Sequence, residues 1–137
     1  MSEQTFLDTL FVVALINQRD QYHSKAEELA SHYEGRQFLT TDAVLLEIGN
    51  ALARNFKEQA VEVINHLLAS PDVEVVRLSP DLFEEGYAIY RSHTDKEWGL
   101  IDCISFVVMR RAGVRDALTF DQHFVQAGLQ ALMRDGL

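Results

Sequence analysis

Residues 98–128 read WGLIDCISFVVMRRAGVRDALTFDQHFVQAG. Within this stretch, Leu100–Ala112 is apolar almost all round until its last turn, which carries arginines and is followed by Gly113. This pattern predicts a core helix with a cationic C-terminus and a glycine cap. Residues 117–120 then predict a short buried strand that stops at Asp121. A core helix that leads into a buried strand is typical of an α/β domain.

The same alternation of strand and helix extends back to the start of the chain. Short apolar or β-branched runs predict strands at residues 5–7, 37–40 and 73–78. Apolar residues at helical spacing predict helices over residues 10–16, 20–33, 41–52, 57–70 and 79–90. The 57–70 helix is expected to point four apolar side chains inward, namely Val61, Ile64, Leu67 and Leu68. We therefore expect a mostly parallel central sheet of four to five strands flanked by helices.

The length and apolar content indicate one domain, residues 1–137. A chain of 137 residues with 47% hydrophobic content can bury a single core and is short for two. Its longest apolar run, residues 10–16, is far below the roughly 20 residues that span a bilayer, so we expect a cytoplasmic protein without a membrane segment. The single cysteine, Cys103, permits no intrachain disulfide and is expected to be a small buried hydrophobe.

The net charge of −9 argues against a protein that holds nucleic acid on an extended basic surface. That objection weakens if several of the 21 acidic residues gather around a divalent cation, because the ion inverts the local field that a phosphate meets. An acidic exterior also favours a basic protein partner.

Four carboxylates interrupt otherwise apolar segments. They are Asp8 in TFLDTL, Glu47 in LLEIGN, Asp102 in GLIDCIS and Asp121 in LTFDQHF. A buried carboxylate is normally protonated, paired with a cation or bound to a metal, and nearby basic residues are too few to pair all four. Oxygen ligands select Mg²⁺ or Mn²⁺, and without a His or Cys beside the acids in a ligand pattern, zinc is not expected.

Three of these acids also have structural explanations when each is taken alone. Asp8 and Asp102 could cap the helices that follow them, and Asp121 could open a turn. Glu47 has no such role, because it lies mid-helix at the border of an apolar face. Asp8 and Asp121 also follow predicted strands, where ligands bind in open α/β sheets.

The local sequence motifs and their spacing resemble those of a PIN domain, the ribonuclease fold of VapC-type toxins in prokaryotic toxin–antitoxin modules. The matching pieces are FLDTLFVVALIN at 6–17, TTDAVLLEIGNAL at 40–52 and the stretch 98–128 quoted above. Together they cover essentially the whole chain. The last piece is the most specific, because acid, helix, strand and acid follow one another at the spacing of the family.

The resemblance implies that Asp8, Glu47, Asp102 and Asp121 are the acidic quartet of the family and bind Mg²⁺ or Mn²⁺. Asp8, Asp102 and Asp121 would hold the metal directly, while Glu47 would either bind it through water or help to orient the nucleophile. The implied activity is that of a metal-dependent endoribonuclease that hydrolyses RNA phosphodiester bonds. An RNA substrate, a cognate antitoxin and a homodimer are implied as partners.

The residues next to the quartet both follow and depart from the family pattern. Thr9 and Thr119 match hydroxyl residues that would orient carboxylates or water. Gly99 and Ile101 stand where relatives often carry Ser and Thr, which affects the rigidity of the loop and its contacts with substrate.

Other functions fit the sequence less well. A phosphatase of the haloacid-dehalogenase type would use Asp8 as a nucleophile and needs an aspartate two residues later, where Leu10 stands. A receiver-type signalling module needs adjacent acids after its first strand, and none follow there. The remaining alternative is a PIN-fold scaffold that binds RNA or protein without turnover. The chain lacks a DNA-binding signature, so within a toxin–antitoxin pair it would be the toxin.

Several polar and aromatic residues carry weaker signals. His123 is expected to be a surface histidine at a helix start, with contact to substrate phosphate as the alternative. Lys96 and Trp98 could meet RNA, although packing of Trp98 onto the domain is preferred. The aromatic residues Phe83, Tyr87 and Tyr90 are expected to be part of the core or of a dimer face. The basic cluster Arg110, Arg111 and Arg115 is expected to cap a helix dipole and pair with surface acids, with RNA contact as the alternative.

Overall fold

A computed structural model describes residues 3–135, so that residues 1–2 and 136–137 of the expected domain lie outside it. Five strands form one sheet in the order β3-β2-β1-β4-β5, and all four neighbouring pairs are parallel. The strands are β1 Gln4–Leu7, β2 Gln37–Thr41, β3 Val73–Val76, β4 Asp116–Leu118 and β5 Gln130–Ala131. The predicted α/β architecture with a parallel central sheet is confirmed.

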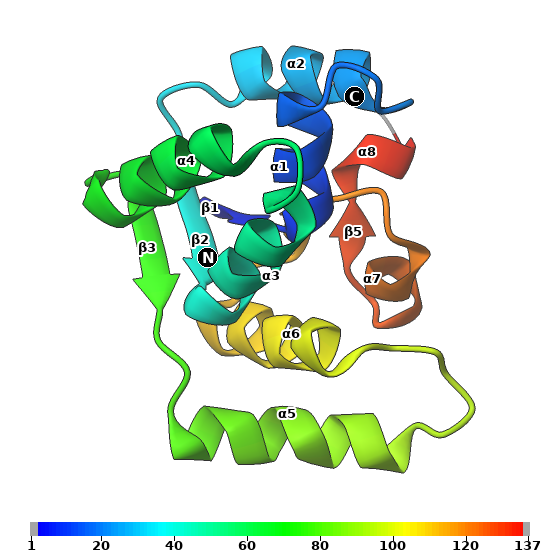
Figure 1. Ribbon diagram of the computed structural model, residues 1–137. Coiled ribbons are helices and arrows are strands. Elements are labelled where there is room, and N and C mark those ends of the chain that lie inside the picture. The colour runs from blue at the N-terminus through cyan, green and yellow to red at the C-terminus, as the bar shows by residue number, and fades with distance from the viewer. Residues whose placement is uncertain (1–2, 136–137) are drawn as a thin grey trace.

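Helices cover the sheet on both sides (Figure 1). They are α1 Thr9–Ile16, α2 His23–His32, α3 Asp42–Leu52, α4 Lys57–Ala69, α5 Pro80–Ser92, α6 Leu100–Ala112, α7 Gln122–Gln126 and α8 Leu132–Asp135. α1 packs against α2 and α3, and α3 packs against α4. α6 contacts β2, and α5 lies on the outer side of α6. None of the helices within residues 3–135 is long and apolar enough to cross a membrane.

Beside β1 lies the reversal of strand order, the point at which the chain stops adding strands on one side of β1 and begins to add them on the other. The chain runs from β1 through β2 to β3 at one edge, then returns through α5 and α6 to β4 on the other side of β1. Ligands of open parallel sheets bind beyond the carboxyl ends of the strands at such a reversal. The strand pairs Phe6↔Ala117 and Leu7↔Leu118 align the ends of β1 and β4 at this point.

The core fills both faces of the sheet, and the part between the sheet and α6 continues into α7. Phe6, Phe106 and Phe124 are almost fully buried, and the ring of Phe124 meets Phe106 edge-on with centroids 5.1 Å apart. Phe6 and Phe124 lie 6.3 Å apart. These contacts join β1, α6 and α7, so the loops that follow β1 and β4 are anchored on large buried side chains.

The main differences from the sequence prediction lie at element ends. β3 ends at Val76 instead of residue 78, because its last ladder partner is Thr41 and the chain of β2 turns there into α3. The amide of Leu78 instead donates to Asp42 Oδ1 at 2.9 Å. The short strand β5, which no hydrophobic pattern indicated, pairs with β4 at the sheet edge.

Several apolar side chains of α4 and α5 that were expected to be covered are exposed. On α4, Leu67 is buried as expected, but Val61 and Leu68 are exposed, so the prediction for these two residues was wrong. They lie seven residues apart on α4, and Ile64, which lies between them on the same stripe, is only partly buried against the core. On α5, the three aromatic residues of the predicted stripe are exposed as well, which rules out a core role and leaves the dimer-face alternative: Phe83, Tyr87 and Tyr90.

Candidate metal centre

Asp8 lies directly after the central strand β1, at the reversal of strand order. Its side chain is buried, and its Oδ2 accepts a hydrogen bond from Thr119 Oγ1 at 2.7 Å. Burial raises the pKa of the Asp8 carboxyl from its ordinary value of 3.8 to about 7, the Thr119 hydrogen bond opposing the rise and the charges of Asp102 and Glu47 adding to it. Near neutral pH, the Asp8 carboxyl therefore populates both its protonated and its ionised form.

Asp121 follows β4 and serves as the N-cap of α7, since its Oδ1 accepts from the amide of His123 at 2.8 Å. The amide of Asp121 donates to Thr119 Oγ1 at 3.1 Å. Thr119 is fully buried and thus connects the acids that follow β1 and β4. The expectation that Thr119 orients a carboxylate is confirmed.

Glu47 lies in the middle of α3, and its Oε1 accepts a hydrogen bond from Thr9 Oγ1 at 2.7 Å. Burial raises the pKa of the Glu47 carboxyl, and the charges of Asp102 and Asp121 add to this effect while the Thr9 hydroxyl opposes it. Thr9 therefore orients Glu47, as the sequence indicated.

Asp102 lies in the first turn of α6, where its Oδ2 accepts from the amide of Gly99 at 3.1 Å. Asp102 is not the N-cap of its helix, as considered from the sequence, because Gly99 occupies that position and Asp102 bonds back to it from the third helical residue. A carboxylate with this one bond retains further lone pairs for a second partner. Burial raises the pKa of the Asp102 carboxyl, and the charge of Asp121 adds to it, while hydrogen bonds from Gly99 and His123 oppose the rise.

The four predicted acids thus converge from four separate elements. Three of their carboxyl groups have a raised pKa to which the charge of at least one other member contributes. Of the four acids, Asp102 and Asp121 belong to a tight cluster with His123 whose possible ligand atoms all lie within 4.8 Å of one another, and Asp8 and Glu47 are not members of that cluster. The arrangement concentrates negative charge at the reversal of strand order.

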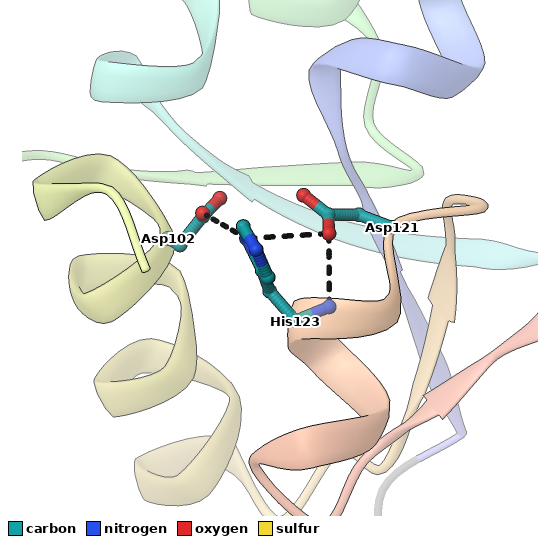
Figure 2. A group of neighbouring side chains, drawn as sticks. All are labelled: Asp102, Asp121 and His123. Atoms are coloured by element: carbon teal, nitrogen blue, oxygen red, sulfur yellow. Dashed lines mark hydrogen bonds and ion pairs between the residues drawn. The ribbon is translucent and has the colours of Figure 1, made fainter. Parts of the chain in front are cut away.

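His123 is the functional candidate that the sequence analysis placed at the surface. Its imidazole lies between two carboxylates, with Nδ1 3.2 Å from Asp102 Oδ2 and 3.3 Å from Asp121 Oδ1 (Figure 2). The side chain is only 23% exposed. The one signal in the sequence was the spacing of Asp121 and His123, because the first turn of a helix brings such residues together. No ligand pattern in the sequence included a histidine, whereas the fold places His123 beside Asp102 and Asp121.

Comparison with known proteins identifies the family. Residues 5–129 match the PIN domain. The chain belongs to the PIN domain family. The 23S rRNA-specific endonuclease VapC20, in two strains of Mycobacterium tuberculosis, is 32% identical to the chain over 123 residues, which cover 90% of this chain and 93% of that protein.

A solved structure extends the likeness to the whole fold. The crystal structure of Mycobacterium tuberculosis VapC20, described as a Sarcin-Ricin loop cleaving toxin, superposes with a TM-score of 0.83 and 30% sequence identity. The match covers 92% of this chain and 96% of that chain. The order of the elements in this PIN domain is therefore shared with a known toxin structure.

Three of the remaining candidates make contacts within the domain. Trp98 is almost buried, meets the ring of Phe106 edge-on, and donates from Nε1 to Gln126 Oε1 at 2.9 Å, so the packing interpretation is confirmed. Lys96 pairs with Asp95 at 3.0 Å. Arg111, from the predicted basic cluster, pairs with surface acids of α5, namely Asp81 and Glu85.

Proposed function

We propose that this PIN domain is a metal-dependent endoribonuclease that hydrolyses RNA phosphodiester bonds, and that it is the toxin of a toxin–antitoxin pair. The observation that carries the proposal is the convergence of Asp8, Glu47, Asp102 and Asp121 at the point where strand order reverses. The 32% identity to a 23S rRNA-specific endonuclease supports the same activity. A complete acidic quartet favours turnover over the scaffold alternative.

The donor chemistry of the site fits a divalent cation, Mg²⁺ or Mn²⁺. Such ions take carboxylate oxygens, and a positive ion would relieve the repulsion that helps to raise the carboxyl pKa values. Asp102 and Asp121 would hold the ion most directly, with Asp8 and Glu47 completing the site. A bound cation would polarise the attacking water and stabilise the departing 3′-oxygen.

The protein's own contribution is to hold the acids in place before RNA arrives. Thr119 orients Asp8, and Thr9 orients Glu47, each through a hydrogen bond of 2.7 Å. Both hydroxyls are buried, so neither hydrogen bond competes strongly with bulk water. Carboxylates restrained in this way need little reorganisation when substrate binds.

We propose structured RNA as the substrate. VapC20 is described as specific for 23S rRNA and as cleaving the Sarcin-Ricin loop, and this chain shares its fold over 92% of its length. Acids dominate the site, so contact with the RNA backbone depends on the cation more than on arginine or lysine. The proposed compartment is the cytoplasm, where such RNA is found.

The proposed protein partners are a cognate antitoxin and a second copy of the chain. An apolar cavity of about 330 Å³ is bordered by α1, α2 and α4, and residues such as Phe11, Leu15 and Leu67 line it. An amphipathic segment of a partner could bury its apolar side chains there. The net charge of −9 favours a basic antitoxin.

The test is cleavage of a Sarcin-Ricin loop RNA and of a pool of structured RNAs, with Mg²⁺, Mn²⁺ or EDTA. We expect cleavage that requires the cation and that falls at least about a hundredfold in Asp8→Asn and in Asp102→Asn. Asp81→Asn is the matched control, because it makes the same chemical change at an exposed residue of α5.

The outcomes separate the proposal from its alternatives. Equal cleavage by the wild type and both site variants would identify a contaminating nuclease and contradict the proposal. Tight Mn²⁺ binding without cleavage of any RNA would favour the scaffold. Loss of cleavage in Asp81→Asn as well would show that the substitutions act by unfolding the domain.

A further inference from the structure

We propose that His123 is a direct metal ligand through Nδ1 and that it makes the site prefer Mn²⁺ to Mg²⁺. The inference rests on the proposed function, because it assigns a further ligand to the same centre. It differs from the sequence expectation, in which oxygen atoms alone would hold the ion. The structure brings a nitrogen atom into the tightest part of the acidic cluster.

The spacing of the donor atoms matches that of ligands on one ion. Nδ1 lies 3.2 Å from Asp102 Oδ2 and 3.3 Å from Asp121 Oδ1. An octahedral ion with bonds of about 2.1 Å separates adjacent ligand atoms by about 3 Å. The imidazole nitrogen therefore needs only a small displacement to share an ion with these two oxygens.

The backbone around His123 restrains the ring at this position. The amide of His123 donates to Asp121 Oδ1, so one carboxylate both caps α7 and faces the imidazole. The aromatic neighbour Phe124 is fully buried against Phe6 and Phe106, which anchors the first turn of α7. Because the ring is held by local structure, little conformational entropy is lost when it binds an ion.

When Nδ1 binds the metal, the proton of the neutral imidazole must lie on the other ring nitrogen, Nε2. The reason is that a nitrogen that binds a metal offers its lone pair to the ion. A small polar cavity borders His123 and is lined also by Lys96, Glu97, Gln122 and Gln126. The Glu97 carboxylate and the Gln122 amide that line this cavity contain oxygens that can accept a hydrogen bond from the ring, directly or through water.

A nitrogen donor changes which ion the site prefers. Mg²⁺ takes oxygen ligands and exchanges them reluctantly, whereas first-row transition ions accept imidazole nitrogen. Two carboxylates with one imidazole thus favour Mn²⁺ over Mg²⁺ relative to the same carboxylates alone. A role as a simple hydrogen-bond donor to the acids would produce no such preference.

The test is electron spin echo spectroscopy of Mn²⁺ on the purified wild-type protein, without RNA. We expect modulation from a directly bound ¹⁴N nucleus, lost in His123→Asn and retained in His32→Asn, whose histidine is exposed on α2. Competition titrations should show Mn²⁺ affinity lower by about tenfold in His123→Asn, with Mg²⁺ affinity within about threefold of the wild type.

The wild-type spectrum can overturn the inference whether or not the variant folds, and the loss of coupling in a folded His123→Asn protein assigns the nitrogen to His123. Mn²⁺ bound without ¹⁴N coupling would overturn the inference, and RNA cleavage in the same sample would leave the proposed function standing. Coupling in a protein that cleaves no RNA would support the ligand assignment and contradict the nuclease proposal. Equal Mn²⁺ to Mg²⁺ affinity ratios in the wild type and a folded His123→Asn protein would also overturn it.

Discussion

Thr119 links the acid that follows β1 to the acid that follows β4. It donates to Asp8 and accepts from the amide of Asp121, and its side chain is fully buried. Thr119→Val keeps the shape of the side chain and removes both hydrogen bonds. We expect a loss of about 1–3 kcal/mol in the free energy of unfolding, because a buried carboxyl group and a backbone amide lose their partner. Urea unfolding measures the loss.

Thr119→Ser is the matched control for this prediction, since it keeps the hydroxyl and removes only a methyl group. We expect most of the RNA cleavage and most of the stability to return in the serine protein. If the valine and serine variants were equally impaired, the methyl group would matter more than the hydroxyl, and the orienting role of Thr119 would be wrong.

The raised pKa of Asp8 predicts an unusual dependence of stability on pH. In the folded protein this pKa is about 7, against 3.8 for an ordinary aspartate. Between these values the folded state keeps a proton that the unfolded state has lost, so the contribution of Asp8 to stability falls as pH rises from 3.8 to 7 and stays low above 7. The charged form of this buried carboxyl is therefore destabilising in the absence of a cation.

Asp8→Asn removes this charge and tests the prediction in EDTA. At pH 8 the variant should unfold at a higher temperature than the wild type, by roughly 5 °C, whereas at pH 4 the two should unfold at similar temperatures. Calorimetry at both pH values measures the difference. A constant difference at pH 4 and pH 8 would mean that packing and hydrogen bonding dominate over the ionisation of Asp8.

At the scale of elements, two mid-helix glycines make opposite predictions. A Cβ at Gly86 of α5 would lie 2.7 Å from Ile104 Cγ1 and 3.2 Å from Ile104 Cα, so Gly86→Ala must push α5 away from α6. We expect a loss of about 1–3 kcal/mol in stability. A Cβ at Gly49 of α3 would meet only Ile64 Cδ1 at 3.9 Å, so Gly49→Ala should be neutral or stabilise by up to about 1 kcal/mol.

Chemical denaturation of the two alanine variants measures both changes under the same conditions. Adding Ile104→Ala to Gly86→Ala tests the cause, because it removes the closest atom. The loss caused by Gly86→Ala should be smaller in that background. Equal effects of alanine at positions 49 and 86 would mean that helix propensity, and not the approach of α5 to α6, controls stability.

At the scale of the whole molecule, the exposed stripe Phe83, Tyr87 and Tyr90 on α5 bears on the proposed homodimer. The rings stack along the helix, with successive centroids 6.1 and 6.4 Å apart. Such a row of exposed aromatic side chains is typical of an interaction surface. We expect the wild type to sediment as a dimer and Tyr87→Glu to sediment as a monomer.

Val61→Glu is the control for the dimer prediction, since Val61 is an exposed apolar residue on α4, away from the stripe. It should leave the dimer intact. A monomeric wild type at all concentrations would contradict the homodimer itself. A dimer that persists in Tyr87→Glu would place the contact on another face of the molecule.

The sequence by itself determined the class of fold and the four acids of the candidate site. Alternating apolar strands and helices are properties of short segments, so they can be recognised before the chain is folded. The acids were recognised for a similar reason, because a carboxylate such as Glu47 inside an apolar helix face has no local explanation. Resemblance to the PIN domain added the expectation that these acids act together.

Only the tertiary structure decided which surfaces are covered and which groups meet. Val61 and Tyr87 look like core residues by their spacing, yet both are exposed, because burial depends on whether another element packs over that face. The position of His123 between Asp102 and Asp121 depends on how the first turns of α6 and α7 are brought together. The contact between His123 and Asp102 joins residues distant in sequence, and no local pattern encodes the distance between them.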